Sequence, residues 1–563
     1  MSRTLFYRDQ ITALETLDLL LPWRTSRVSL YKPAINVLSG RRLMCFHNTV
    51  IKLTLIVFSF CSQTLAQSNE ATSTLIAEEP IVLSAHFHYS KFQSYDENWP
   101  VEVAACEMTN VCIVDATIGA DLEKSTKAIN VLLASGEIPD IVGASPIKDI
   151  ANQFGPRGAF LPLNSLIDKH APHIKSLLQD RPILRDSISA ADGNIYHIPY
   201  LPDGKFARVY WIRTDWLESL NLAMPETIEE FEEVLVAFRD RDPNGNGLKD
   251  EIPFFARHWQ EYIRLVTLFG GRSTGTDLYH DFVHTDRKIS HPYIQDGYRD
   301  GIHHLARWYR EGLVDPEIFT RGEKSREQLL SRNVGGATRD WMPSTSTFNN
   351  LSSEIEGFEF RVMSPPANVN GIRFEENRRS QVKASGWAIG ALTDKPIETM
   401  KYFDFWFSPE GRRLANFGIE GEQYDLIDGE PIFKPEFLAQ GPVNDQLHAI
   451  GAQMMVRGFP QDHSYEVQWS NQIALEGIAL YEQGDYLIEE FPGVSFNEEE
   501  QRTYDKLWWQ IRSYMLKRQK EWILGEGEIM TDWEDYLLEL EQMQLDTVLS
   551  AVQSAFDRQY SRK

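Results

Sequence analysis

Positive charge is in short supply along this chain of 563 residues. It carries 56 Lys and Arg against 81 Asp and Glu, which gives a formal net charge of −25. No basic patch of useful size is present, and this argues against a nucleic-acid partner. The acidic residues are spread diffusely, as solubility alone would favour. The hydrophobic fraction of 42% indicates a globular protein, neither disordered nor fibrous.

Familiar enzyme motifs are also missing. The sequence has no Gly-x-Ser-x-Gly, Walker loop, His-Glu-x-x-His or dinucleotide fingerprint. A glycosidase needs two carboxylates across a cleft, whereas the adjacent acids at 96–97 and 375–376 have side chains that tend to diverge. His86 and His88 would share one strand face, but no third metal ligand is apparent. We therefore predict a protein that is not an enzyme, with a secreted polysaccharide lyase or glycosidase as the alternative.

The apolar run Leu53–Phe60 is too short to span a bilayer. Lys52 precedes it and small residues ending at Ala66 follow it, which is the pattern of a secretory signal. We expect cleavage near Ala66, with Met44 as the true start and residues 1–43 as an artefactual extension. Removing residues 1–66 takes away eight basic and three acidic residues, so the mature net charge becomes −30.

Cysteine is scarce, and two of the four cysteines fall in or before the signal. A lipoprotein signal needs small residues before its cysteine, but Phe60 precedes Cys61, so we expect a soluble periplasmic protein of a two-membrane bacterium. Cys106 and Cys112 remain in the mature chain. In an oxidising compartment they form one local disulfide or stay as two buried thiols, and the sequence leaves both open.

Segments with strand and helix periodicity alternate through roughly the first 400 residues, and the last 90 or so are mostly helical. We expect strands at 80–88, 138–142, 195–199, 208–213, 334–337 and 387–392. We expect helices at 121–135, 146–154, 162–182, 215–220, 227–239, 259–269, 294–311, 395–407, 410–417, 469–483, 498–524 and 533–560. Such alternation predicts an α/β fold with layered sheets.

The stretch 242–251 predicts a calcium-binding loop. Calcium takes roughly six to eight oxygen ligands from a compact, flexible loop. Side chains at alternate positions can face one point, and the two glycines let the backbone curl. The expected ligands are Asp242, Asn244, Asn246, Leu248 through its carbonyl, Asp250 and Glu251.

A second register of this loop begins at Asp240 and fits the spacing of an EF-hand. The segment that follows, 252–255, is Ile-Pro-Phe-Phe, which is extended in character and not an exiting helix. We therefore favour the ten-residue register that begins at Asp242. A lone loop without a paired partner suits a structural Ca²⁺ better than a sensor.

This loop and several further segments resemble the extracellular solute-binding proteins of ABC importers, of the larger oligosaccharide-binding type. Within that family the chain is most similar to periplasmic alginate-oligosaccharide-binding proteins. The segments that carry the resemblance, spread over roughly residues 80–560, lie at 96–100, 134–142, 158–164, 171–175, 192–196, 198–204, 240–247, 340–341, 386–389, 416–418 and 555–560.

The resemblance implies a two-lobed periplasmic-binding-protein fold, type II-like, with a cleft between lobes and a helical C-terminal section. It also implies hinge closure on an oligosaccharide, delivery to permease subunits, and calcium outside the cleft. We expect residues 75–195 mainly in the first lobe and 196–335 mainly in the second. Residues 336–410 should cross back to the first lobe, and 411–563 should form second lobe and C-terminal helices. A monomer is expected.

An acidic oligosaccharide needs aromatic faces for its rings and cations for its carboxylates. The cation candidates are Lys91, Arg339, Arg378 and Arg379. The other candidate contacts, with Trp341 the leading one, are Tyr95, Asn98, Trp99, Tyr200, Asp203, Trp341, Trp387, Tyr424 and Tyr465. For most of the tryptophans, core packing is the alternative role.

The mature charge of −30 argues against a polyanionic ligand unless the cleft is locally basic. Neutral sugars therefore remain open as ligands. A chemoreceptor-linked sugar-binding protein with the same fold is a further alternative that the sequence does not separate from an importer component.

Overall fold

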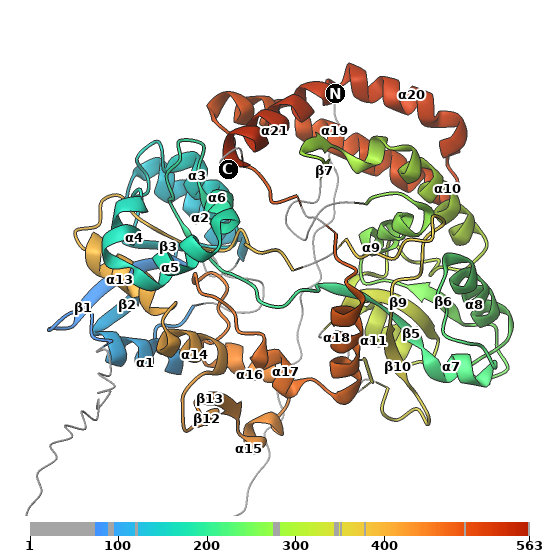
Figure 1. Cartoon of the computed structure of the whole chain (residues 1–563), viewed down its shortest axis with the longest axis horizontal. Coiled ribbons are helices and arrows are strands. Elements are labelled where there is room, and N and C mark those ends of the chain that lie inside the picture. Colours follow the sequence, from blue (N-terminus) through green and yellow to red (C-terminus); the bar gives the residue numbers. More distant parts are fainter. Residues whose placement is uncertain are drawn as a thin grey trace, which may run out of the picture. The chain divides into compact units, whose positions relative to one another are not determined.

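The structure is a computed structural model, and it describes residues 74–87, 95–118, 122–273, 282–342, 348–349, 352–376, 379–488 and 491–560. The expected signal peptide, Lys91 and Arg378 lie outside the described residues. Two sheets organise the described part, a five-stranded one and a four-stranded one (Figure 1). Each sheet with its covering helices forms one lobe.

The first sheet has the strand order β2-β1-β3-β11-β4. Strand β1 runs parallel to both β2 and β3, whereas β11 is antiparallel to β3 and β4. The strands are β1 (Ile81–Phe87), β2 (Val111–Asp115), β3 (Ile141–Ala144), β4 (Ile198–Pro199) and β11 (Gly386–Ile389). Strand β11 comes from far along the chain, so the chain returns to this sheet after building the other.

The second sheet has the order β10-β5-β9-β6. Strand β5 is antiparallel to β10 and β9, and β6 is parallel to β9. The strands are β5 (Arg208–Arg213), β6 (Ile252–Phe255), β9 (Gly335–Trp341) and β10 (Phe360–Met363). The chain passes between the two sheets at 200–207, at 364–385 and after residue 469.

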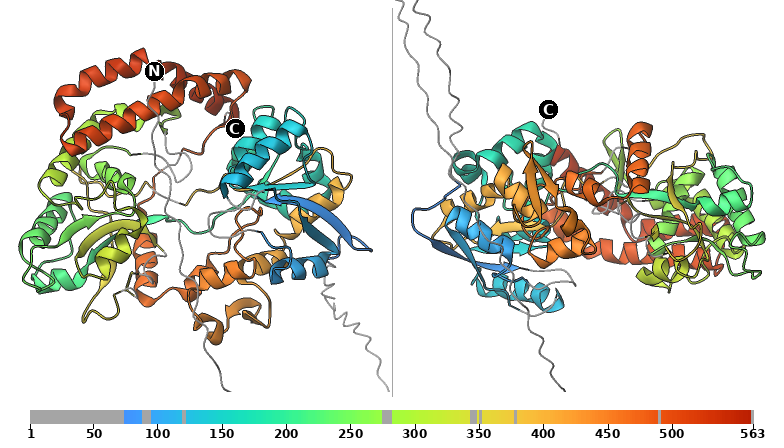
Figure 2. Two further views of the ribbon diagram at one scale, coloured as in Figure 1. Left: turned by 180° about the vertical axis from the view of Figure 1, so that it is seen from behind. Right: turned by 90° about the horizontal axis from the view of Figure 1, so that it is seen from below.

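Alternation along the strands buries both faces of each sheet. In β11, Trp387 and Ile389 face one core while Ala388 faces another. In β5, Tyr210 and Trp211 divide in the same way between two cores. Helices therefore cover both faces of both sheets, as the views from front and back show (Figure 2). The predicted α/β class is confirmed.

Helices next to the first sheet come from the N-terminal half and from residues 396–469. Most match the expected ranges within a few residues. They are α1 (Pro100–Thr109), α2 (Leu122–Ser135), α3 (Ile147–Phe154), α4 (Asn164–His170), α5 (Pro172–Asp180), α6 (Pro182–Ile188), α13 (Pro396–Phe405), α14 (Pro409–Phe417), α15 (Pro435–Leu438), α16 (Val443–Ala449) and α17 (Ser464–Trp469). A hairpin of β12 (Tyr424–Ile427) and β13 (Glu430–Phe433) lies between α14 and α15.

The remaining helices accompany the second sheet and form the C-terminal section. They are α7 (Thr214–Ser219), α8 (Ile228–Asp240), α9 (Trp259–Ile263), α10 (Asp296–Arg310), α11 (Ser325–Leu330), α18 (Gln472–Gly484), α19 (Glu498–Leu524), α20 (Ile529–Gln542) and α21 (Leu545–Tyr560). Short 3-10 turns span Arg264–Phe269, Pro292–Ile294 and Gly322–Lys324, and β7 (Val283–Thr285) pairs with β8 (Lys288–Ser290). In the described residues no helix is long and apolar enough to cross a membrane.

Capping chemistry sets the start of the longest helix. Asn497 accepts hydrogen bonds from the backbone N–H groups of Glu499 and Glu500, and the Glu500 carboxylate accepts one from the Asn497 N–H, which completes a capping box. Gly525, at φ 77°, ends the same helix in the left-handed conformation that glycine adopts without strain. The predicted range 498–524 is therefore confirmed.

Three expectations differ from the structure. The first strand–helix–strand unit contains an additional helix and strand, α1 and β2. They were not expected, because the periodicity of residues 100–115 is weak. The predicted helix 533–560 is two helices that meet at Gln544, where φ is 66°. Residues 411–469 were expected in the second lobe, but Phe417, Phe433 and their neighbours pack in the core of the first sheet.

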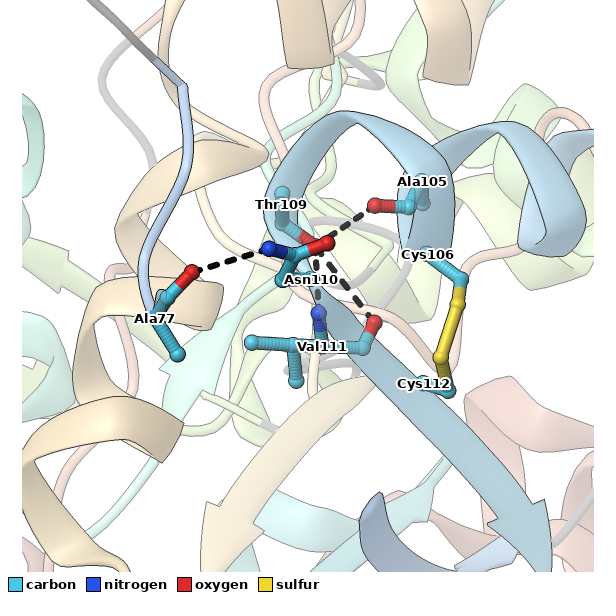
Figure 3. Close-up of a disulfide and its surroundings, with 7 residues drawn as sticks. All are labelled: Ala77, Ala105, Cys106, Thr109, Asn110, Val111 and Cys112. Atoms are coloured by element: carbon cyan, nitrogen blue, oxygen red, sulfur yellow. Dashed lines mark hydrogen bonds between the residues drawn. A yellow bond between two sulfur atoms is a disulfide. The ribbon is translucent and has the colours of Figure 1, made fainter. Parts of the chain in front are cut away.

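Cys106 and Cys112 form a disulfide that joins the last turn of α1 to β2 (Figure 3). Asn110 between them takes the left-handed conformation at φ 57° and reverses the chain. Its side-chain amide donates to the carbonyl of Ala77, 3.0 Å away. The disulfide therefore closes a tight turn at the edge of the first sheet, and it decides the alternative that the sequence left open.

Candidate functional site

The loop predicted to bind calcium connects α8 to β6. The Asp242 carboxylate accepts hydrogen bonds from the backbone N–H groups of Asn246 (3.1 Å) and Gly247 (2.9 Å). The Asn246 amide donates to Asp250 Oδ1 at 3.0 Å. Positive φ angles at Asp242, Gly245 and Gly247 let the backbone curl around these side chains.

Glu251 closes this loop with an unsatisfied carboxylate. The residue is only 8% exposed, and neither carboxylate oxygen has a hydrogen-bond partner among the described residues. Burial raises the pKa of Glu251, and the negative charges of Asp242 and Asp250 raise it further. A hard cation would satisfy these buried oxygens. No group of three His, Cys, Asp or Glu side chains already converges into a metal site in the described part of the chain.

The alternative EF-hand register is disfavoured by the position of Asp240. Both of its carboxylate oxygens accept hydrogen bonds from Arg239, at 2.8 and 2.7 Å. The extended segment after the loop is strand β6, as predicted. The Leu248 side chain is 59% exposed, which agrees with a role for its backbone only. The carboxylate of Asp240 is therefore paired with an arginine, whereas the oxygens of Asp242 accept hydrogen bonds only from backbone N–H groups of the loop itself.

Two of the predicted sugar contacts, Arg339 and Trp341, lie on strand β9. Trp341 ends the strand, is partly exposed, and is register-paired with Arg208 at the start of β5. The guanidinium of Arg208 lies 5.5 Å from the centroid of the Trp341 ring, and that of Arg379 lies 5.8 Å from it. Two guanidinium groups therefore lie beside the Trp341 ring, and an acidic sugar requires this combination of cations and an aromatic ring.

Arg339 is buried, and it contacts Glu375 and, at 3.1 Å, Glu261. Glu261 is also buried, and two further arginines reach it: Arg208 at 2.8 Å and Arg264 at 3.7 Å. Although burial acts to raise the pKa of Glu261, the arginines hold it below its usual value. Two buried carboxylates, Glu261 and Glu375, therefore face three guanidinium groups.

A cavity of about 400 Å³ opens beside this cluster. Three arginines line it, Arg208, Arg264 and Arg512, with Glu261 as its one acidic residue. The other polar lining residues are His258, Gln260, Ser273, His291 and Tyr293. A second buried acid, Asp340, lies close by with Arg257 at 3.2 Å and Arg326 at 3.4 Å. Arginines therefore outnumber the buried carboxylates, so this part of an acidic protein is locally basic.

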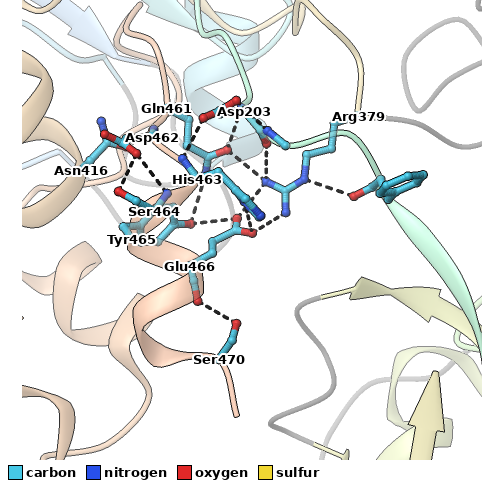
Figure 4. A network of polar contacts seen from close by, with 12 residues as sticks. Asp203, Arg379, Asn416, Gln461, Asp462, His463, Ser464, Tyr465, Glu466 and Ser470 are labelled. Carbon is cyan, nitrogen blue, oxygen red and sulfur yellow. Dashed lines mark hydrogen bonds and ion pairs between the residues drawn. The ribbon is translucent and has the colours of Figure 1, made fainter. Parts of the chain in front are cut away.

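Arg379 belongs to a network at the connections between the two sheets (Figure 4). It donates to the carbonyl oxygen of Asp203 (2.7 Å) and to Glu466 Oε1 (2.9 Å). Burial acts to raise the pKa of Glu466, but the Arg379 guanidinium lowers it to about 2. Asp203 in turn accepts from the N–H of His463 at 2.9 Å. Asp203, Arg379 and Glu466 lie in or next to the three connections between the sheets. The Arg379 guanidinium is therefore already paired with groups of the protein.

The other aromatic candidates are largely buried. Trp387 stacks on Phe403 with ring centroids 4.1 Å apart, and Tyr200 packs on Phe459. Their neighbours in the first core include three further candidates, Tyr95, Trp99 and Tyr465. Tyr424 also packs in this core, and Asn98 is exposed. In the described arrangement these buried rings present little surface to a sugar, and their predicted contacts remain untested.

Known proteins with this architecture bind oligosaccharides. The crystal structure of the alginate-binding protein AlgQ2 without calcium ion shares 42% sequence identity, covers 86% of this chain and 99% of its own, and superposes with a TM-score of 0.76. The fructooligosaccharide ABC transporter substrate-binding protein FusA of Streptococcus pneumoniae is 27% identical over 463 residues, which are 77% of this chain and 82% of FusA. This chain belongs to the solute-binding proteins of ABC oligosaccharide importers.

Other relatives of the solute-binding protein bind varied sugars. The polygalacturonan/rhamnogalacturonan-binding protein YtcQ of Bacillus subtilis is 25% identical over 334 residues, 57% of this chain and 63% of YtcQ. FusA has been solved as an EF-hand mutant with fructo-nystose, at 22% identity and a TM-score of 0.68. No family model matches the sequence. The resemblance inferred from short segments and the two-lobed fold are thus both confirmed.

Sequence reasoning missed the arginines that make the cavity of this solute-binding protein basic. Arg208 begins a strand, Arg264 begins a 3-10 turn, and Arg512 lies within the longest helix. The available signal was the position of Arg208 at a strand end, where binding residues gather. Their convergence depends on the pairing of β5 with β9, which no local pattern reveals. The acids at 375–376 do diverge: Glu375 contacts Arg339, and Glu376 contacts Arg272 at 2.5 Å.

Proposed function

We propose that this solute-binding protein binds acidic, alginate-type oligosaccharides without catalysis and delivers them to its importer. The observation that carries the proposal is the basic cavity beside Trp341, with Arg208, Arg264 and Arg512 in its lining. AlgQ2, an alginate-binding protein, supports the same class of ligand. The local excess of guanidinium groups removes the objection raised by the net charge of −25.

Arginine suits this role because its planar fork binds a carboxylate through two hydrogen bonds at once. Hydrogen bonds to charged groups contribute about 1.5 to 3 kcal/mol each when well formed. In the cavity, Glu261 holds Arg208 and Arg264 in place without neutralising both. The site is thus preorganised for a second carboxylate, which a uronate residue supplies and a neutral sugar does not.

The test is calorimetric titration of the mature, calcium-loaded protein with oligomannuronates, oligoguluronates, oligogalacturonates and neutral kestose. We expect an acidic oligosaccharide to bind at least about tenfold more tightly than kestose, in line with one added charged hydrogen bond. Arg264→Gln should weaken acidic binding, because it removes one guanidinium while Glu261 keeps two others.

The matched control is Arg287→Gln, which removes an arginine that is 53% exposed and does not line the cavity. It should leave every affinity unchanged. Binding of kestose alone would contradict the acidic-sugar proposal and leave the importer family intact. Release of unsaturated, ultraviolet-absorbing products from alginate would contradict the non-catalytic role.

We also propose that Ca²⁺ binds the loop at 242–251 and braces the second lobe. The buried carboxylate of Glu251 and the nearby negative charges of Asp242 and Asp250 support it. When bound, the ion would offset the mutual repulsion of these carboxylates. Binding of the ion would raise the free energy of unfolding by an amount that grows with the free Ca²⁺ concentration. The gain is about 2.7 kcal/mol when that concentration is a hundred times the dissociation constant.

Differential scanning calorimetry with Ca²⁺ and with a chelator tests this second proposal. We expect the melting temperature of the wild type to fall on chelation, and that of Glu251→Gln to be low and insensitive to Ca²⁺. Asp240→Asn is the control, since Asp240 pairs with Arg239 and should keep the full calcium response. Equal melting temperatures of wild type with and without Ca²⁺ would refute the site.

For location, we propose export to the periplasm with cleavage near Ala66 and function as a monomer. The disulfide between Cys106 and Cys112 supports an oxidising compartment. N-terminal sequencing of the exported protein should begin near Gln67, and a mature protein that retained residues 1–43 would contradict the proposed processing.

A further inference from the structure

Helix α19 contains two adjacent tryptophans with opposite environments. Trp508 is 4% exposed and packs near Phe282, with ring centroids 4.9 Å apart. Trp509 is 70% exposed, although an indole of this size normally covers apolar surface. Trp508 accounts for the packing of the helix at this point, so Trp509 needs another explanation.

Trp509 lies one turn before the part of α19 that lines the basic cavity. Arg512, Met515 and Leu516 line the cavity. In an α-helix, residues three and seven positions apart project from similar sides, because a turn contains about 3.6 residues. Trp509 is therefore near Arg512 and Leu516 on the helix surface, at a distance of about 5 Å from Arg512 along the helix axis.

We propose that Trp509 is a stacking platform for the sugar unit next to the one whose carboxylate enters the cavity. The inference rests on the proposed acidic-oligosaccharide function and adds a residue that sets chain-length preference. A pyranose ring has one face of C–H groups, which packs on an indole face while its polar groups stay in water. One helical turn is comparable in length to one sugar unit, so the spacing from Arg512 to Trp509 fits consecutive units.

The charges around Trp509 suit an acidic chain that reaches it from the cavity. On the same stripe, Arg512 lies toward the cavity and Arg502 lies toward the start of the helix. Asp505 is engaged by the Gln501 amide at 2.8 Å. A carboxylate on a sugar above Trp509 would thus lie between two cations. A protein partner would use the same exposed ring without dependence on sugar length, and this difference is what the experiment exploits.

The experiment compares affinities for oligomannuronates of two and four units, measured by calorimetry on the full mature protein with Ca²⁺. Trp509→Ala should weaken binding of the tetrasaccharide about five- to tenfold, the range that aromatic packing contributes, and alter binding of the disaccharide less than twofold. Trp509→Tyr should restore most of the loss, because it keeps an aromatic face. Leu538→Ala, which removes a 53% exposed side chain on α20, should change neither affinity.

The outcomes separate this inference from the function on which it rests. If wild type binds no acidic oligosaccharide, both are overturned. If wild type binds them and Trp509→Ala leaves both affinities unchanged, only the platform is overturned, and an effect confined to transport would assign Trp509 to a protein contact. Equal losses for both chain lengths would also overturn it, since the ring would then act inside the cavity.

Discussion

Glu261 illustrates how a single side chain acquires its role from its neighbours. It lies on α9, a helix of five residues that has no sequence motif of its own. In the folded protein three arginines surround its buried carboxylate, at 2.8, 3.1 and 3.7 Å. Buried guanidinium groups are costly unless paired, so Glu261 both permits the cluster and limits its net charge.

Neutralising this residue should destabilise the protein. We expect Glu261→Gln to lower the free energy of unfolding by about 3 to 5 kcal/mol, because buried guanidinium groups lose their partner. Because the pKa of Glu261 is lowered, its stabilisation is present above the usual Glu pKa and is lost as pH falls through the lowered value. Urea unfolding at several pH values should therefore show the two proteins converge in acid. The control is Glu317→Gln, which breaks an ion pair with Arg321. The Glu317 side chain is 60% exposed, so this change should lower the free energy of unfolding by less than about 1 kcal/mol.

Single positions also carry the calcium-loop prediction. Asp242 and Glu251 are recognisable because calcium ligands must be close in sequence in a tight loop. Arg339 and Arg379 were named as sugar contacts from residue type alone. The structure pairs them with Glu375 and Glu466, which lie far away in the sequence. Residue type identifies candidates for charge recognition, but it does not show which charges are already paired.

At the scale of elements, helix signals predicted boundaries well where capping residues were present. Helix α19 begins after Asn497 and ends at Gly525, as capping chemistry requires. The segment containing α1 and β2 was missed because a short helix and a short strand are joined by a tight turn with weak periodicity. There the disulfide between Cys106 and Cys112 supplies the constraint.

Removing that disulfide should loosen the α1–β2 unit. We expect replacement of both cysteines by serine to lower the free energy of unfolding by about 2 kcal/mol, since the closed loop is short. Thermal unfolding with and without a reductant provides the measurement. The wild type should lose stability in the reductant and the double variant should not respond. A wild type indifferent to reductant would contradict a stabilising bond.

At the scale of the whole molecule, the connections between the sheets meet in one polar network. Asp203 belongs to the first crossing and Arg379 to the second, and Glu466 precedes the third. In two-lobed binding proteins such connections absorb the hinge motion on ligand closure. Arg379 therefore links segments that belong to different connections.

Breaking this network should free the connecting segments. We expect Arg379→Gln to speed backbone hydrogen exchange in 200–207 and 464–469, because the buried Glu466 loses its partner. Exchange in the central strands of each sheet should change much less. Arg361→Gln, which removes a half-exposed surface pair, is the control and should leave both segments unchanged. Unaltered exchange in the Arg379 variant would show that the network does not restrain the hinge.

The sequence by itself determined the α/β class, most helices and the family. These features depend on periodicity, capping residues and short motifs, which involve residues that are close together in the sequence. Only the tertiary structure decided that Cys106 and Cys112 are bonded, that residues 411–469 join the first lobe, and that arginines from β5, from the turn after α9 and from α19 line one cavity. Those features arise from contacts between distant segments, where burial and pairing of charge depend on the complete fold.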